Sequence, residues 1–278
     1  MIAFVNNLKT VLLLGLLTGL LVAVGGMMGS QYIIPMLVIA GLMNLGAWFF
    51  SDRLAIAAMR GRELNADTGG DVYRMLVRLS ERARLPRTPR LYISPHQAPN
   101  AFATGRSPSK AAVCFTQGAL DLLNPQEIEG VMAHELAHIK NRDTLISTVS
   151  AVVAGVLAML AQWAFFIVPR GGERTNPFMS IIVVIIAAVG AAIIKAAISR
   201  SREFVADAHG AEIAGSPHGL ISALQKLEAY SKRIPLVQPN PAQNNLFIVE
   251  PFAGKTLTNL FATHPPTEQR VAALLRAG

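Results

Sequence analysis

The sequence predicts a mainly α-helical integral membrane protein, with four transmembrane helices in two hairpins and a water-exposed α+β domain that contains a small β-sheet. Three observations support this fold class. The 278 residues are 52% hydrophobic and only 15% charged. The mean hydropathy is +0.41, which is too apolar for a chain whose whole surface lies in water. Charged residues are nearly absent from four stretches and dense between them, as in a membrane enzyme or transporter.

The four apolar stretches pair into two predicted hairpins. Residues 10–27 and 32–50 each approach the roughly 20 residues needed to cross a bilayer as a helix. Lys9 before an apolar run is also typical of a cleavable signal peptide, but the second run follows after a very short connection, which favours a hairpin. Residues 145–168 and 178–195, separated by a polar turn, predict the second hairpin. Buried core helices of a soluble protein are the alternative for these last two runs.

Cationic residues near the span ends predict the orientation. The formal net charge is +8, from 25 Lys+Arg against 17 Asp+Glu, and most cations near spans fall on one side, which should be the cytoplasm. Only Arg170 and Arg174 lie opposite. No basic run with interleaved aromatic residues supports nucleic-acid binding, and the single Cys114 excludes an internal disulfide. The cations on the predicted cytoplasmic side are Lys9, Arg53, Arg60, Arg62, Lys140, Arg142, Arg200 and Arg202.

The two hairpins divide the water-exposed domain into two segments. Residues 1–52 form the first hairpin and residues 144–198 the second. Residues 53–143 and 199–278 have ordinary globular composition, and neither half looks self-sufficient. The expected elements are a helix over 71–85, strands over 90–94 and 111–116, a strand or loop over 100–105, a helix from Asn124 through Asp143, a helix over 199–214, another from Ser216, a loop from Pro235 to about Thr256, and a short helix from about Thr267.

The helix that begins near Asn124 has a strong start signal. Asn124 can cap it, Pro125 suits the first helical position, and Glu127 can reach back to the cap. This helix carries His134-Glu135-Leu136-Ala137-His138, the H-E-x-x-H pattern. Two His four residues apart are rotated by about 40° and separated by about 6 Å along the axis, so both imidazoles can reach one ion.

Zinc is the expected ion, and a third ligand is needed because catalytic zinc sites take three protein ligands plus water. Glu203 is the candidate, since it begins the helix after the fourth span on the same side of the membrane. His209 and His218 are rivals that lie farther along, beside Gly and Pro. Asp207, one turn after Glu203, could fix the tautomer of a ligating His. Alternatively, the two acidic residues balance neighbouring arginines.

The H-E-x-x-H motif, Arg142-Asp143 and Glu203-Phe204-x-Ala206-Asp207 together resemble the HtpX family of bacterial inner-membrane zinc metalloproteases, which are relatives of the eukaryotic CAAX prenyl proteases. The resemblance covers nearly the whole chain, including residues 100–105 and 263–266. It implies a gluzincin-type zinc metalloprotease domain in which one Zn²⁺ per subunit is held by His134, His138 and Glu203. It also implies that Glu135 is the general base.

The resemblance gives further residues a role. Asn100, Ala101 and Phe102 are similar to a substrate-facing edge strand, on which an extended peptide could pair. His264 and Arg270 resemble residues that relatives place near the substrate carbonyl, where a cationic donor could stabilise an oxyanion. Without the resemblance, His264 would be a turn residue before two prolines and Arg270 a solvated helix charge.

The leading hypothesis is a membrane-bound endopeptidase that cleaves misfolded or damaged membrane proteins on the cytoplasmic side of the inner membrane. Its expected partners are membrane-protein or unfolded polypeptide substrates and the lipid bilayer, with no nucleic acid. A CAAX-type processing protease is a second enzyme hypothesis, but four spans are too few for a large enclosed chamber. A transporter would carry more polar or broken helices at mid-membrane than Asn44 and Gln162 indicate. A catalytically silent metal-binding scaffold would lack a ligand or the base.

Overall fold

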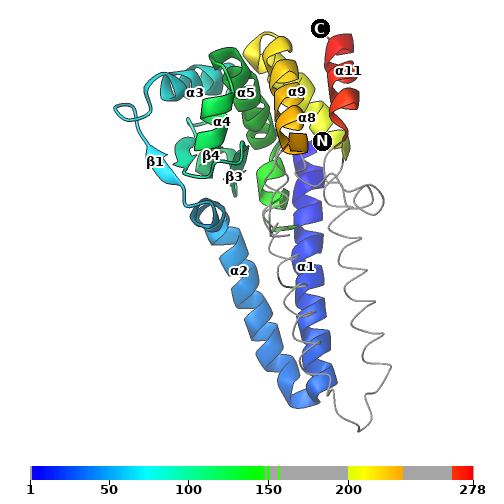
Figure 1. Cartoon of the computed structure of the whole chain (residues 1–278). Coiled ribbons are helices and arrows are strands. Elements are labelled where there is room, and N and C mark those ends of the chain that lie inside the picture. Colours follow the sequence, from blue (N-terminus) through cyan, green and yellow to red (C-terminus); the bar gives the residue numbers. More distant parts are fainter. Residues whose placement is uncertain (1, 148, 151–155, 157–199, 234–264, 278) are drawn as a thin grey trace.

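The computed structural model describes residues 2–147, 149–150, 156, 200–233 and 265–277. Helices α1 (Ile2–Met28) and α2 (Ile33–Ala58) form a hairpin that projects from the globular part of the protein (Figure 1). Within them, Phe4–Gly26 and Ser30–Phe50 are long and apolar enough to cross a membrane. Only 28% and 11% of these windows are buried, so the core helix of a soluble protein does not describe them.

The hairpin is held by apolar packing and one polar contact. Leu13 and Leu17 are buried between the helices. Asn44 of α2 donates through Nδ2 to Thr18 Oγ1 at 2.8 Å and to the Leu14 carbonyl at 3.1 Å, which satisfies its amide donor away from water. The described start of the third apolar run also packs on α1, through Leu145, Ile146, Val149 and Val156. The fourth apolar run lies outside the described residues.

A four-stranded sheet lies between the hairpin and the helices of the globular part. Its order is β1-β2-β4-β3, with β2 and β4 parallel and both outer pairs antiparallel. The strands predicted at 90–94 and 111–116 are confirmed, and the segment after Asn100 is a strand rather than a loop. The first strand was not predicted. The bounds are β1 Arg62–Leu64, β2 Arg90–Ser94, β3 Ala101–Gly105 and β4 Ala111–Thr116.

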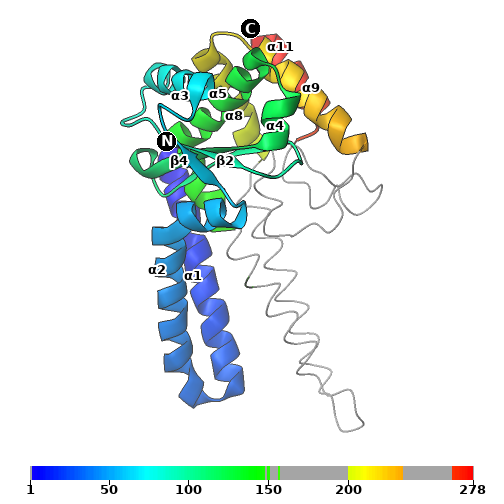
Figure 2. The same ribbon diagram turned by 60° about the vertical axis from the view of Figure 1, so that its left-hand side comes forward.

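The helices gather around α5, at the end of the molecule away from the tip of the hairpin (Figures 1 and 2). Helix α5 contacts β3, β4, α3, α8 and α9, and its Val131, Met132 and Leu136 are fully buried in the main core. This central position explains why most of α5 is apolar or small. The bounds are α3 Gly70–Arg82, α4 Gln117–Leu122, α5 Pro125–Asn141, α8 Arg200–Ala214, α9 His218–Arg233 and α11 Thr267–Ala277.

The predicted start of α5 is confirmed. Asn124 Oδ1 accepts from the Glu127 amide at 3.0 Å, and Glu127 Oε2 accepts from the Asn124 amide at 2.8 Å. The same carboxylate receives Ser222 Oγ at 2.6 Å and Lys226 Nζ at 2.8 Å from α9. Burial opposes the charge of Glu127, but these donors lower the pKa of Glu127 overall. One side chain therefore caps α5 and docks α9.

The predicted end of α5 was wrong by two residues. The helix ends at Asn141 rather than Asp143, because Arg142 adopts a left-handed conformation with φ 61°. Its amide still bonds back to the carbonyls of His138 and Ile139. The chain resumes helix at Asp143, and this break turns the Asp143 carboxylate back towards α5.

Candidate metal centre

Helices α5 and α8 bring together the three residues predicted as metal ligands. His134 Nε2 and His138 Nε2 lie 3.1 Å apart on α5. The Glu203 carboxylate of α8 places Oε2 3.8 Å from His134 Nε2 and Oε1 3.6 Å from His138 Nε2. One donor atom from each residue lies within 4.8 Å of the others. The three donors thus converge on one point from two helices.

A glycine allows α8 to approach this part of α5. A Cβ at Gly210 would lie 2.9 Å from His134 Cα and 3.0 Å from the His134 amide nitrogen, which is closer than side-chain atoms pack. Glu203, Asp207 and Gly210 are spaced at i, i+4 and i+7, so they share one face of α8. The contact at Gly210 therefore fixes where both carboxylates of that face meet the histidines.

The hydrogen bonds of the two imidazoles favour a metal ion between them. His134 Nδ1 lies 3.0 Å from Asp207 Oδ1, and His138 Nδ1 lies 3.0 Å from Asp143 Oδ2. These partners assign the protons to both Nδ1 atoms. The two Nε2 atoms, 3.1 Å apart, then face one point, where a cation bound by both nitrogens would replace the proton that they otherwise share. Two ligands about 2.1 Å from a tetrahedral zinc lie about 3.4 Å apart, so the donor set fits this ion.

The electrostatics of the site also attract positive charge. Burial disfavours a charged His138 imidazole, yet the hydrogen bond to Asp143 and the nearby Glu203 carboxylate raise the pKa of His138 to about 9. The site stabilises a positive charge at His138 even against desolvation. A divalent cation bound to these nitrogens would gain from the same carboxylates.

Glu135 lies beside the three donors and contacts the sheet. Its side chain is buried, and its carboxylate accepts a hydrogen bond from the Ala103 amide of β3. Burial raises the pKa of Glu135, although the two imidazoles and the Ala103 amide act in the opposite direction. A carboxylate with a raised pKa is a stronger proton acceptor when ionised. The position and basicity of Glu135 match those of a general base in an H-E-x-x-H site.

Arg270 of α11 holds Asp207 in place. Its Nε and Nη2 donate to Asp207 Oδ2 at 2.8 Å and Oδ1 at 2.6 Å, a bidentate arrangement that fixes the carboxylate plane. Burial opposes ionisation of Asp207, but the Arg270 hydrogen bonds and charge bring the pKa of Asp207 down to about 2. Arg270 is 1% exposed and its Nη1 lies 3.7 Å from Glu203 Oε2. It is an internal ion-pair partner of the centre rather than the solvated helix charge that sequence reasoning alone favours.

The structure adds a contact that the sequence did not reveal, between the membrane hairpin and the metal centre. Asn6 of α1 donates through Nδ2 to Asp143 Oδ1 at 2.6 Å and to the Asn141 carbonyl at 3.1 Å. Asn6 and Asp143 are both 3% exposed. The chain His138–Asp143–Asn6 therefore joins a predicted zinc ligand to the first apolar helix. The sequence signal was a polar residue near the end of an apolar run, which alone does not identify its partner.

The predicted substrate segment forms the edge of the sheet. Side chains of Ala101 and Phe102 are buried, at 2% and 4% exposure, and Asn100 pairs through its backbone with Thr116. Any contact with a peptide must therefore come from the strand backbone. The Ala103 N–H donates to Glu135 and so points away from β4. Because the backbone groups of successive residues alternate between the two sides of a strand, those of Ala101 and Ala103 both face the edge of the sheet.

The other predicted residues are placed as follows. His209 lies 3.3 Å from Asn141 Nδ2 through its Nδ1, and His218 is exposed at the start of α9. Neither joins the donor cluster that the described residues form, so Glu203 is the better third donor. His264 lies outside the described residues.

An H-E-x-x-H helix, a glutamate from a following helix and a buried base beside the last strand of the described sheet define a zinc-type metallopeptidase. Residues 66–277 match peptidase family M48. The chain belongs to this family.

Full-length relatives agree with that assignment. The chain is 46% identical over 277 residues to "Protease HtpX homolog" of Desulforapulum autotrophicum, covering 97% of this chain and 89% of the relative. It is 47% identical over 278 residues to the protein of the same name from Pelotomaculum thermopropionicum, covering 97% and 98%. The protein is thus a membrane metalloprotease of the HtpX type. A crystal structure of S. mikatae Ste24p matches with a TM-score of 0.48 and 17% identity, over 98% of this chain and 66% of that chain.

Proposed function

We propose that the protein is a zinc endopeptidase of the bacterial inner membrane, which cleaves misfolded or damaged membrane proteins and unfolded polypeptides on the cytoplasmic side. The observation that carries the proposal is the convergence of His134, His138 and Glu203 beside Glu135, at the base of an apolar hairpin. These three donors would hold one Zn²⁺ per subunit. Their position next to the hairpin suits substrates that emerge from the bilayer.

The residues of the site have separate roles in peptide hydrolysis. Bound zinc would polarise the scissile carbonyl and lower the pKa of a water molecule towards about 7. Glu135 accepts the proton of the attacking water and returns it to the leaving amine. Asp207 and Asp143 keep the two imidazoles in the tautomer that leaves Nε2 free for the ion. His264 is proposed as a hydrogen-bond donor to the substrate carbonyl.

The open side of β3 offers a place for the substrate backbone. An extended peptide that adds to this edge pairs through main-chain hydrogen bonds and is selected little by sequence, which suits a protease of unfolded segments. Ala103 ties the strand to Glu135, so a peptide on this edge passes the base. Of the three predicted residues, Ala101 would therefore contact the peptide through its backbone, whereas the backbone groups of Asn100 and Phe102 face β4 and hold the strand on the sheet.

The proposed topology has four spans, with the domain divided at residues 52, 143 and 198. Two features support it. The described start of the third apolar run packs against Leu13 and Leu17 of α1, as expected if that run crosses the membrane next to the first span. The cations flanking the runs favour a cytoplasmic domain.

The decisive experiment purifies the full chain in detergent under chelation, restores zinc and measures casein cleavage. Glu135→Gln should keep zinc and lose activity by about a thousandfold or more, because only the base is removed. Glu203→Ala should lose zinc affinity as well. Glu129→Gln, on the same helix and paired with Arg78, is the matched control and should cleave normally.

Three outcomes would contradict the proposal. Retained cleavage in Glu135→Gln would remove this residue as the base. Unchanged zinc affinity in Glu203→Ala would mean that the third ligand has been assigned wrongly. Cleavage of a prenylated CAAX peptide but not of casein would replace general proteolysis by prenyl-protein processing.

A further inference from the structure

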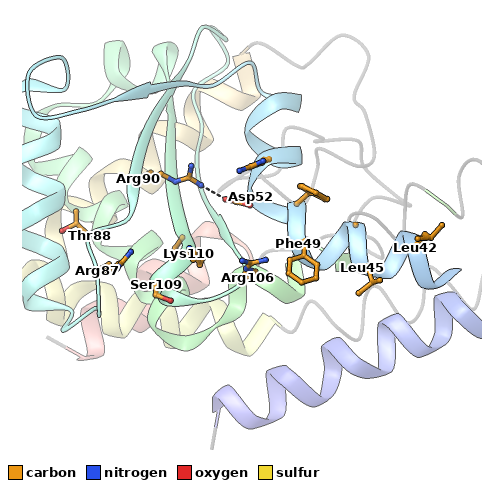
Figure 3. A pocket seen from close by; sticks show the side chains of 14 residues that line it. Leu42, Leu45, Phe49, Asp52, Arg87, Thr88, Arg90, Arg106, Ser109 and Lys110 are labelled. Atoms are coloured by element: carbon orange, nitrogen blue, oxygen red, sulfur yellow. Dashed lines mark hydrogen bonds and ion pairs between the residues drawn. The ribbon is translucent and has the colours of Figure 1, made fainter. Parts of the chain in front are cut away.

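A cavity lies where α2 meets the globular part, away from the metal centre. It has a volume of about 780 Å³ and is bounded by α2, by the segment before β2 and by the turn between β3 and β4 (Figure 3). This volume falls in the range of small-molecule sites. None of the proposed catalytic residues lines it, so the cavity is separate from the metal centre.

The two ends of the cavity differ in chemistry. One wall is apolar and comes from Leu42, Leu45 and Phe49 of α2, which lie within the candidate span ending at Phe50. These side chains are more than half exposed, at 65%, 57% and 52%. They face hydrocarbon if α2 crosses the membrane. The apolar wall thus lies within the bilayer, just below its surface.

The opposite wall is cationic. Arg53, Arg87, Arg90, Arg106 and Lys110 line it against the single carboxylate of Asp52, which leaves a formal charge of +4. Asp52 is bound by Arg90, with Oδ2 and Nη2 2.5 Å apart. Among the residues that the structure describes, the other four cations form no ion pair with a carboxylate.

Arg106 joins the two walls. Its guanidinium carbon lies 4.9 Å from the centre of the Phe49 ring (Figure 3), a cation–π contact that fixes the charge at the height where the span ends. A ligand in this cavity must therefore be apolar at one end and anionic at the other. Its charged end must lie at the level of the lipid headgroups.

We propose that this cavity is a binding site for one anionic phospholipid. The acyl chains lie along Leu42, Leu45 and Phe49, and the phosphate is bound by Arg106 and Lys110, with Arg53 beside it. Basic pockets at the cytoplasmic end of transmembrane helices bind anionic headgroups in this way. The proposal rests on the membrane placement of α2 but not on peptidase activity. A bound lipid would fix α2 against the turn that follows β3.

The test measures lipid binding to the delipidated full chain in detergent by native mass spectrometry, with phosphatidylglycerol and phosphatidylcholine as probes. Wild type should bind phosphatidylglycerol about tenfold more tightly. Arg106→Gln with Lys110→Gln should lose this preference. Arg74→Gln with Arg276→Gln removes the same amount of charge from exposed positions on α3 and α11. This variant should keep the preference for phosphatidylglycerol.

Further arms separate a lipid site from general attraction of anions. Arg106→Lys with Lys110→Arg keeps both charges and should keep most of the preference, while zinc content and thermal unfolding report folding of every variant.

Equal loss of the preference in the Arg74 and Arg276 variant would overturn the proposal in favour of general surface charge. Glycerol phosphate competing as well as the lipid would reduce the cavity to an anion site. Equal binding of the two lipids by wild type would show that the cavity does not select an anionic lipid, which contradicts the proposal. Lipid binding is measured without turnover. A failure of the proposed protease function would therefore leave the lipid-binding result unchanged.

Discussion

The two histidines of the metal centre are oriented by different parts of the molecule. His134 is bonded to Asp207, whose carboxylate is clamped in two places by a buried arginine of the globular core. His138 is bonded to Asp143, whose carboxylate accepts one hydrogen bond from the amide of Asn6 in the apolar helix α1 and lies 3.9 Å from Arg202 Nη1 of α8. One half of the site therefore depends on the globular interior alone. The other half depends on the contact between that interior and the membrane hairpin.

The two arrangements also differ in strength. Asp207 accepts two hydrogen bonds from one arginine in a bidentate ion pair, whereas Asp143 accepts a single hydrogen bond from a neutral amide and lies 3.9 Å from its cation, and the bidentate pair is the stronger arrangement. The His134 side is the rigid half, and the His138 side is the half that the membrane can adjust. Substitutions at five residues, four at the site and one at the far end of α5, test this contrast.

The largest effect is expected on the rigid side. Arg270→Met leaves Asp207 buried with an unpaired charge, which should lower the free energy of unfolding by about 3–5 kcal/mol. Thermal unfolding of the purified chain in detergent measures it. Arg276→Met, an exposed change on the same helix, is the control. An unchanged unfolding midpoint in Arg270→Met would show that the ion pair does not stabilise the fold.

The next effect separates affinity from stability. Asp143→Asn should weaken zinc binding about tenfold, because it weakens the group that orients His138, while thermal stability changes little. Asp207→Asn should reduce both, since it also breaks the pair with Arg270. Competition with a zinc chelator measures affinity. Similar stability losses in both variants would contradict the proposed contrast between the two halves.

A smaller effect should come from the membrane side. Asn6→Leu removes the amide that holds Asp143, so zinc affinity should fall about fivefold, the equivalent of the roughly 1 kcal/mol of one hydrogen bond. The neighbouring Asn7 is exposed, and Asn7→Leu should leave affinity unchanged. If both variants bind zinc as wild type does, the contact does not position His138.

The smallest effect lies at the far end of α5. Glu127→Gln should lower the free energy of unfolding by about 1 kcal/mol at neutral pH and leave zinc affinity unchanged. Because the fold lowers the pKa of Glu127, its stabilisation is fully present above the ordinary value near 4.5 and is lost as the pH falls below it. The difference between wild type and variant should shrink on acidification. A difference that grows on acidification would assign the opposite sign to this shift.

Local signals made much of the fold predictable. Asn124, Pro125 and Glu127 determine the start of α5 through contacts between near neighbours, and strands such as Ala111–Thr116 have the residue types of their element. The spacing of His134 and His138 alone placed two donors on one helix face. Glu203 was found because it begins the helix after the fourth apolar run, on the predicted side of His134, and Asp207 because it lies one turn further along that helix.

The missed features depend on distant packing or on unusual conformations. A left-handed Arg142 has no signature in a sequence where glycine would be expected, so the end of α5 was misplaced. The strand Arg62–Leu64 is only three residues long. Asn6 meets Asp143 across 137 residues of chain, and no local pattern reports such a contact. Arg270 is buried only because α11 packs on α8.

The hydrogen bond between Asn6 and Asp143 links the metal centre to the insertion of α1 into the membrane. The metal centre as described combines Asn6, the His134 helix, Glu203 and Arg270, and Asn6 reaches its place when α1 lies beside the folded domain. A nascent chain, a fragment or a molecule that fails to insert has an incomplete or loosely ordered site. Full zinc affinity is thus expected only once α1 has inserted beside the domain, so that an unanchored chain would bind the ion less tightly.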